Sequence, residues 1–125
     1  MSPADALARA RAMLGVPFRL HGRDRNGVDC VGLAAAAWAV EAPTGYALRS
    51  APRGRVERVM AAAGFVASEG VPGAVVLIAP APGQLHLGIA TGAGLIHADA
   101  VARRVVERPA PLPWPLLAAW IREEE

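Results

Sequence analysis

The hydrophobic pattern of the chain changes at Gly70, and this change most limits the folds open to the sequence. Before Gly70 the apolar residues are largely alanines, which favour helix, whereas after it short apolar runs alternate with proline and glycine. Such runs are typical of strands, and they occupy residues 75–78, 85–90, 95–98 and 104–107. Helices followed by consecutive strands favour an α+β fold. We therefore predict one domain, residues 1–125, with N-terminal helices packed on an antiparallel β-sheet meander.

Residues typical of helix starts and helix ends predict two helices in the first third of the chain. Ser2 is a suitable N-cap, Pro3 fits the first helical position, and Gly15 ends the first helix. Asp29 is the natural N-cap of a second helix over about residues 30–40. The glycine-rich and charged segment 16–28 between them is predicted to be a loop with one extended stretch at 18–20.

The remaining segments are marked by proline and glycine. Pro43, Thr44 and Gly45 interrupt the chain after the second helix, and a third helix over residues 55–63 stops at Gly64. A proline-rich connector at 109–114 is predicted to lead into a last short helix at 116–122.

Charge and hydropathy exclude two classes of partner. The thirteen basic residues, all arginine, are scattered among eleven acids, so we expect no nucleic-acid partner. No apolar run approaches the ~20 residues that span a bilayer, so we expect no membrane insertion. The N-terminus lacks a basic segment followed by an apolar one. We therefore expect synthesis in the cytoplasm without a signal peptide, and any work outside the cell would need another means of delivery.

Cys30 is the only cysteine, so it cannot form an internal disulfide, and its role must come from burial, metal binding or reactivity. In the first turn of a helix capped by Asp29, unpaired backbone N–H groups are expected to lower the pKa of the thiol. The same donors could stabilise an oxyanion. The alternative is that Cys30 is a small buried hydrophobe without chemistry.

Two histidines are predicted to meet on one face of a hairpin. If Gly92 and Ala93 form a two-residue loop, Gly88 lies opposite His97, and His86 is a diagonal neighbour of His97. Gly88 would leave the space between the two imidazoles empty. A three-residue loop would instead turn His97 to the other face, so the prediction depends on the turn.

Two interpretations of these residues are open. In the first, Cys30 is a nucleophile, His86 is the base that activates it, and His97 orients His86. In the second, the histidines bind a metal with Cys30 or Asp99 as a third ligand. The spacing matches no compact zinc motif. We therefore predict a thiol enzyme without metal or other cofactor.

Other polar and aromatic residues give weaker signals. His21 precedes the nucleophile and is expected either to line the cleft or to lie exposed in the loop. Arg23, Asp24 and Arg25 are expected to form a solvated loop, with an arginine–carboxylate contact to substrate as the alternative. The tryptophans are expected to pack in the core or an interface, and they are Trp38, Trp114 and Trp120.

Taken in order, the motifs resemble those of the NlpC-type cell-wall cysteine peptidases. The resemblance covers nearly the whole chain and rests on 18–22, 29–33, 86–89 and 96–98. It implies a papain-like core with Cys30 at a helix start and His86 and His97 on an antiparallel sheet. It further implies hydrolysis of peptidoglycan stem peptides, typically between a γ-linked D-glutamate and a diamino acid.

One branch of the family is more similar still. The loop 17–22, the 29–33 motif and the tryptophan-containing tail resemble short peptidases encoded with tail genes of phages and gene-transfer agents. This implies a virion tail-associated enzyme that acts on the periplasmic cell wall, with tail proteins as partners. A tail-tip structural subunit with little or no activity is an alternative function, and an amidase or acyltransferase on another substrate is a second.

The sequence departs from the family pattern at one position. Many relatives have a tyrosine about a dozen residues before the cysteine, whose hydroxyl is thought to help form the oxyanion site. Phe18 stands at that position here and has no hydroxyl. The resemblance therefore implies either a weakened oxyanion site or a hydrogen-bond donor from another residue, such as His21. Asp29, at the start of the helix, is a further candidate residue of this site.

Overall fold

The computed structural model describes residues 1–42 and 52–123. Within these residues the helices are α1 (Pro3–Arg11), α2 (Cys30–Trp38) and α3 (Arg53–Ala62). The strands are β1 (Arg23–Asp24), β2 (Gly27–Val28), β3 (Phe65–Ala67), β4 (Val75–Ile78), β5 (His86–Ala90), β6 (Gly94–Asp99), β7 (Arg104–Pro109) and β8 (Leu116–Arg122). None of the helices in this described part is long and apolar enough to cross a membrane.

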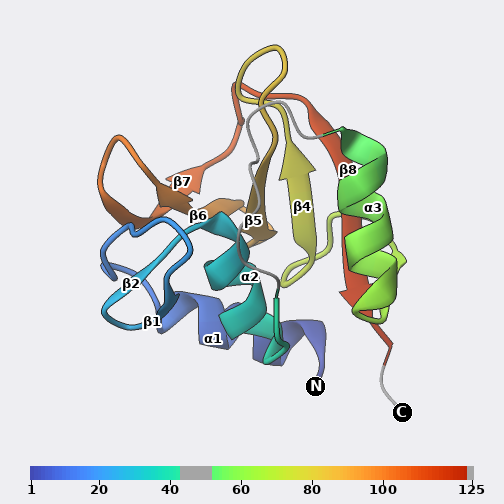
Figure 1. The fold of residues 1–125 in the computed structure, drawn as a ribbon, viewed down its shortest axis with the longest axis horizontal. Helices are drawn as coiled ribbons and strands as arrows, with labels where there is room; N and C mark the ends of the chain where they lie inside the picture. Colours follow the sequence, from blue (N-terminus) through green and yellow to red (C-terminus); the bar gives the residue numbers. More distant parts are fainter. Residues whose placement is uncertain (43–51, 124–125) are drawn as a thin grey trace.

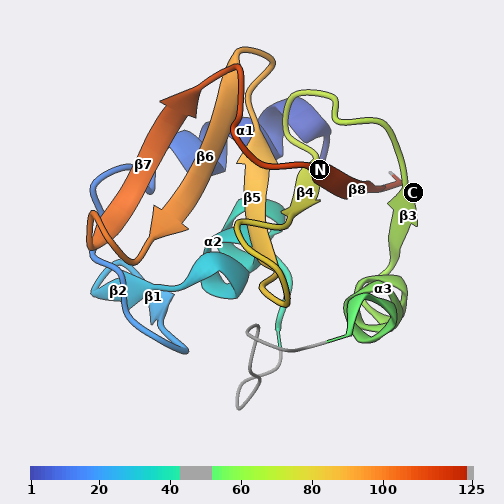
Figure 2. The same ribbon diagram turned by 90° about the horizontal axis from the view of Figure 1, so that it is seen from above.

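Six strands form one antiparallel sheet in the order β3-β8-β4-β5-β6-β7, and β1 pairs with β2 in a separate hairpin. Strands β4 to β7 form the predicted meander (Figure 1). The chain then crosses back, and β8 pairs with β4 on the side away from β5 (Figure 2). The α+β prediction is thus confirmed, and the sheet contains two strands, β3 and β8, in addition to the four of the meander.

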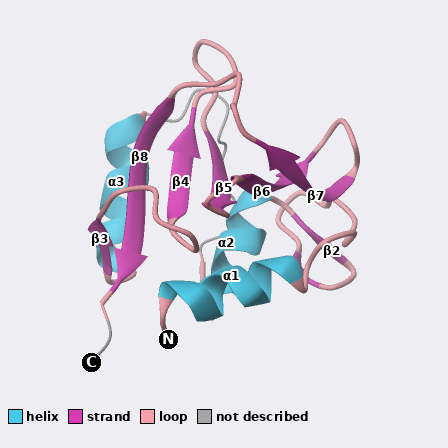
Figure 3. Ribbon diagram, turned by 180° about the vertical axis from the view of Figure 1, so that it is seen from behind, coloured by secondary structure: helices cyan, strands magenta, loops and turns pink. Residues whose placement is uncertain are grey.

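The helices lie at two places on the sheet. Helix α2 packs on β5 and β6 with α1 against it, and α3 lies beside β3 (Figure 3). The main core lies between the sheet and the helices, where Leu33, Trp38, Leu77, Ile89 and Ile96 are almost fully buried. This packing holds the first turn of α2 close to the start of β5.

The predicted helix at 116–122 is wrong, because these residues form β8. Burial along the segment alternates as in a strand: Ala118 and Trp120 contact the main core, whereas Ala119 belongs to the smaller cluster with Val76 and Leu95. Local helix propensity is therefore overridden by pairing with β4 and β3.

The other differences between the predicted and the observed secondary structure are smaller. The first helix ends at Arg11, and the turn that follows runs to Gly15, whose φ is 86°. The segment predicted as a loop contains the β1–β2 hairpin, while Phe18 makes a bridge with Val28 near the expected extended stretch. Strand β3 was not predicted. The break at Pro43–Gly45 lies outside the described residues.

Candidate active site

Cys30 is the first residue of α2, as the sequence predicts. Asp29 is the N-cap, and its Oδ1 accepts a hydrogen bond from the backbone N–H of Gly32 at 2.8 Å. The run of alanines that follows continues the helix to Trp38, whose indole Nε1 donates to the carbonyl of Gly73 at 3.0 Å. Cys30 is only 3% exposed. The cap therefore places the sulfur at the helix start, and packing of the helix on the sheet buries it.

The two histidines are hydrogen-bonded to each other. His86 Nε2 lies 3.0 Å from His97 Nδ1, and the rings meet edge-on with centroids 5.2 Å apart. The register pairs Ile89 with Ile96, and the N–H of Thr91 donates to the carbonyl of Gly94. The predicted two-residue loop and the shared face are therefore confirmed, while the catalytic roles stay predictions.

The space beside Gly88 is filled, contrary to the sequence-based expectation. A Cβ atom on Gly88 would lie 2.5 Å from Leu95 Cδ1 and 3.0 Å from the carbonyl oxygen of Ile96. Glycine is thus required at this position because Leu95 on the neighbouring strand occupies the room that a side chain would need.

A cleft of about 670 Å³ brings the predicted residues together. Cys30, His86 and His97 all line it, and so do Phe18 and Asp29. His21 is not among the residues that line it and instead supplies its backbone N–H to Asp29. The remaining lining residues are Leu20, Pro80, Gln84, Leu85, Ala98, Asp99, Ala100, Val101 and Trp114.

Trp114 is a site residue that the sequence analysis missed. Its ring meets that of His97 edge-on with centroids 5.7 Å apart, and the guanidinium carbon of Arg108 lies 4.9 Å from the indole centroid. Trp114 stands in the connector between β7 and β8. Residues 116–122 have the composition of a helix, so no local signal in the sequence places this connector across the sheet, next to His97.

Burial, not the helix N-terminus, dominates the pKa of Cys30. Burial raises the pKa of the thiol to about 12, and the Asp29 carboxylate adds to this increase. Backbone N–H groups of Leu87, Val31 and Cys30 itself act in the opposite direction but are outweighed. The expectation of a lowered thiol pKa is therefore wrong for this state, because the sulfur is shielded from water.

Both histidines are shifted toward the neutral form. Burial lowers the pKa of His86 to about 4, and repulsion from His97 adds to the shift, whereas Asp99 and Asp29 oppose it. Burial also lowers the pKa of His97. At neutral pH the site therefore holds a neutral thiol and neutral imidazoles, so that a proton can pass from sulfur to nitrogen when a substrate binds.

The lowered pKa of His86 predicts a loss of stability in acid. The unfolded state binds a proton near pH 6.5, but the folded state does so only near pH 4. The free energy of unfolding should therefore fall between these pH values by an amount of the order of 3 kcal/mol. Urea denaturation at pH 7 and pH 4.5 measures it, with His86→Gln as the non-titrating control. Equal pH dependence in both proteins would contradict the prediction.

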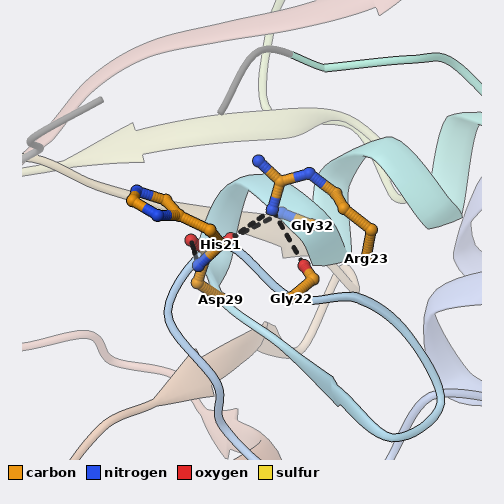
Figure 4. A network of polar contacts seen from close by, with 5 residues as sticks. All are labelled: His21, Gly22, Arg23, Asp29 and Gly32. Carbon is orange, nitrogen blue, oxygen red and sulfur yellow. Dashed lines mark hydrogen bonds and ion pairs between the residues drawn. The ribbon is translucent and has the colours of Figure 1, made fainter. Parts of the chain in front are cut away.

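A second polar group holds the loop before Cys30 (Figure 4). Asp29 is 2% exposed and accepts from the N–H of His21 at 2.8 Å and from Arg23 Nη1 at 3.1 Å. Arg25 reaches the carbonyl of Ala12 at 2.8 Å. The prediction of a solvated loop is thus wrong for Arg23, which is partly buried against Asp29, whereas Asp24 and Arg25 are exposed as expected.

No group of three or more His, Cys, Asp or Glu side chains that could hold a metal ion is present in the described ranges, 1–42 and 52–123. The two histidines, the thiol and the cleft can support chemistry in which a proton moves between sulfur and nitrogen. Such an arrangement is suited to nucleophilic attack on a carbonyl carbon.

Comparisons with known proteins give the fold a name. No protein-family model matches the sequence, and no curated protein matches it either. Among solved structures, NlpC1 from Trichomonas vaginalis has a TM-score of 0.69 at 18% identity, covering 96% of this chain and 45% of its own. An NlpC/p60 family protein from Bacillus cereus has a TM-score of 0.69 at 20% identity, with 98% and 40% covered.

A third structure is closer to this chain in length. The NlpC/p60 domain of the peptidoglycan hydrolase SagA has a TM-score of 0.60 at 22% identity, and the match covers 87% of this chain and 90% of that domain. In contrast, this chain spans less than half the length of the Trichomonas and Bacillus proteins. The expected NlpC-type architecture is confirmed at the level of structure. The chain therefore has the fold of the NlpC/p60 proteins.

Proposed function

We propose that this protein is a cysteine peptidase that hydrolyses amide bonds in the stem peptides of peptidoglycan. The contact between His86 Nε2 and His97 Nδ1 at 3.0 Å, in the cleft that Cys30 lines, carries this proposal. It pairs a proton acceptor with a group that can orient it, beside a single thiol at a helix start. The fold shared with the peptidoglycan hydrolase SagA supports the choice of substrate.

The tautomers follow from the contact. For His86 to accept a proton at Nδ1, its own proton must lie on Nε2, which then donates to Nδ1 of His97. His97 in turn carries its proton on Nε2. The edge-on contact with Trp114 helps to fix the plane of the His97 ring. His97 would therefore select the form of His86 that can act as a base.

The reaction proceeds in two steps. Cys30 gives its proton to His86 as the sulfur attacks the scissile carbonyl carbon, and the resulting oxyanion is stabilised by backbone N–H groups at the start of α2. The C–N bond breaks, the amine leaves with the proton from His86, and an acyl-enzyme remains. Water then gives a proton to His86 and attacks the thioester, which releases a carboxylic acid and restores the thiol.

The scissile bond and the route to the cell wall are further parts of the proposal. From the resemblance of its motifs, we infer cleavage between γ-D-glutamate and a diamino acid. The same resemblance suggests delivery by the tail of a phage or gene-transfer agent, with tail proteins as partners and the periplasmic wall as the place of action.

Mass spectrometry of purified muropeptides tests the enzyme hypothesis. The wild-type protein should release two fragments whose masses add up to the mass of the substrate plus one water. The Cys30→Ala variant should release no fragments. Cleavage that persists in Cys30→Ala would contradict the proposed nucleophile. A panel of small amides and acyl donors would identify an amidase or acyltransferase on another substrate.

A second candidate is a tail-tip structural subunit with the same fold and weak or no activity. It is favoured by Phe18, which lines the cleft without offering a hydroxyl to an oxyanion. Absence of any product after long incubation of the wild-type protein would support this role and reject the peptidase.

The Phe18→Tyr variant should be more active than the wild-type protein. A tyrosine hydroxyl in this cleft would add one donor to the oxyanion site, and single donors of this kind change kcat by about a hundredfold. Steady-state hydrolysis of a muropeptide measures the gain. Phe18→Leu, which alters the ring without adding a donor, should show no gain. Equal rates for Phe18→Tyr and the wild-type protein would mean that backbone groups already fill this role.

A further inference from the structure

We propose that Arg23 is a positioning residue for the nucleophile, acting through Asp29 on Cys30. Its guanidinium holds the segment before Cys30 against the first turn of α2 and balances the charge of the carboxylate that caps this helix. The inference deepens the proposed cysteine-peptidase function and rests on it for the role of Cys30. The contacts of Arg23, however, can be tested without any substrate.

The contacts converge on one buried carboxylate (Figure 4). Oδ1 of Asp29 accepts from the N–H of Gly32 at 2.8 Å and from Arg23 Nη1 at 3.1 Å, while Oδ2 accepts from the N–H of His21 at 2.8 Å. The same Nη1 donates to the carbonyl of Gly22 at 2.8 Å. Arg23 therefore ties the helix cap to the backbone of the segment that precedes it.

Two glycines show how closely this segment packs against its neighbours, α2 at Gly32 and β2 at Gly22. A Cβ atom on Gly32 would lie 2.1 Å from the carbonyl oxygen of Gly22 and 3.2 Å from Arg23 Nη1. A Cβ atom on Gly22 would lie 2.2 Å from the carbonyl oxygen of Gly27. The backbone of 21–23 is thus in direct contact with the first turn of α2, and Arg23 bridges the two at their point of contact.

The charge of Arg23 matters because Asp29 lies next to the sulfur. Asp29 is 2% exposed, and a buried carboxylate without a balancing cation is costly and acts on its neighbours. Its negative charge opposes ionisation of Cys30 and favours protonation of His86. The effect on Cys30 disfavours the thiolate, and the guanidinium of Arg23 reduces it, whereas the effect on His86 makes this histidine a better proton acceptor.

In residues 1–42 and 52–123, the other charged or titratable groups near the site come from four segments. They are His21 in the loop before β1, His86 on β5, His97 and Asp99 on β6, and Arg108 on β7. Of these, Asp99 is a second acid that acts on His86 in the same direction as Asp29. Arg23 contributes a cation that forms an ion pair with the Asp29 carboxylate.

Alkylation of Cys30 by iodoacetamide tests the proposal, because Cys30 is the only cysteine of the chain. The rate constants of the wild-type protein, R23K, R23Q and R23Q/D29N are compared at several pH values below the pKa of the thiol. There the rate follows the thiolate fraction, so a pKa that is higher by one unit lowers the rate about tenfold. Thermal unfolding of each variant provides the folding control.

We expect R23Q to be alkylated about tenfold more slowly, R23K to stay within about threefold of the wild-type rate, and R23Q/D29N to recover. The recovery separates charge from structure, since loss of packing alone would affect R23Q and the double variant alike. A wild-type rate in R23Q, or no recovery in R23Q/D29N, would overturn the proposal.

Two further measurements complete the test. If R23Q does not fold, the alkylation rate of Cys30 is measured in D29N instead. Removal of the carboxylate charge should speed alkylation, and an unchanged rate would refute the charge effect. Muropeptide hydrolysis by R23Q, where it folds, should show a lower kcat with an unchanged KM, and R23K should keep a kcat within about threefold of the wild-type value. Failure of the wild-type protein to cleave muropeptides would reject the peptidase but not the effect of Arg23 on the thiol.

Discussion

Replacing His86 with alanine should lower kcat for peptide hydrolysis by about 10²- to 10⁴-fold, the range typical of a lost general base. The neutral thiol of Cys30 depends on a nearby acceptor, because burial raises its pKa to about 12. His86, which shares the cleft with Cys30 and is held by His97, is the acceptor that the geometry offers. Rates of muropeptide cleavage, measured by chromatography of the fragments, give the ratio.

Two variants control for folding and for the role of the partner histidine. His86→Gln retains a polar side chain but cannot take up the proton, so it should be as inactive as His86→Ala. His97→Gln should lose less activity, because it removes the orientation of His86 but leaves the base in place. A His86→Ala protein that folds and retains activity within tenfold of the wild-type value would exclude His86 as the base.

Gly32→Ala should disrupt both the fold and the site. The new Cβ would lie 2.1 Å from the carbonyl oxygen of Gly22, a backbone atom that can move only with the loop. Overpacking of this kind costs about 1–3 kcal/mol of stability. Displacement of the nucleophile by about 1 Å can reduce activity about a hundredfold. Urea denaturation and muropeptide cleavage measure the two effects.

Gly54→Ala is the matched control, because Gly54 also lies in the first turn of a helix, α3. Its added Cβ would find only the tip of Arg58 at 3.5 Å, an ordinary contact. Alanine is the better helix former, so stability should stay the same or rise by up to about 1 kcal/mol, with unchanged activity. Equal behaviour of the two variants would show that the contact between α2 and the loop does not constrain the site.

Local signals were sufficient for the parts of the site that depend on neighbours in sequence. Asp29 before a run of alanines predicted the helix start that holds Cys30. The turn at Gly92 and Ala93 determined the register, and the register brought His86 to His97. In both cases the geometry follows from a cap or from strand alternation, which act over a few residues.

The features that the sequence did not predict depend on contacts between distant segments. Residues 116–122 have the composition of a helix, and only pairing with β4 and β3 makes them a strand. The position of Trp114 beside His97 follows from that crossing. The pKa of Cys30 likewise depends on how deeply packing buries the sulfur, which the helix start alone does not determine.

The late position of β8 in the sequence has a consequence for synthesis on the ribosome. Strand β8 lies between β3 and β4, yet it follows the other five strands of this sheet in the sequence and therefore leaves the exit tunnel after them. Until then β3 lacks its neighbour in the sheet, and one edge of the fully apolar β4 is open to other chains. A nascent chain that stalls before residue 116 would therefore expose this unpaired strand edge, which favours aggregation.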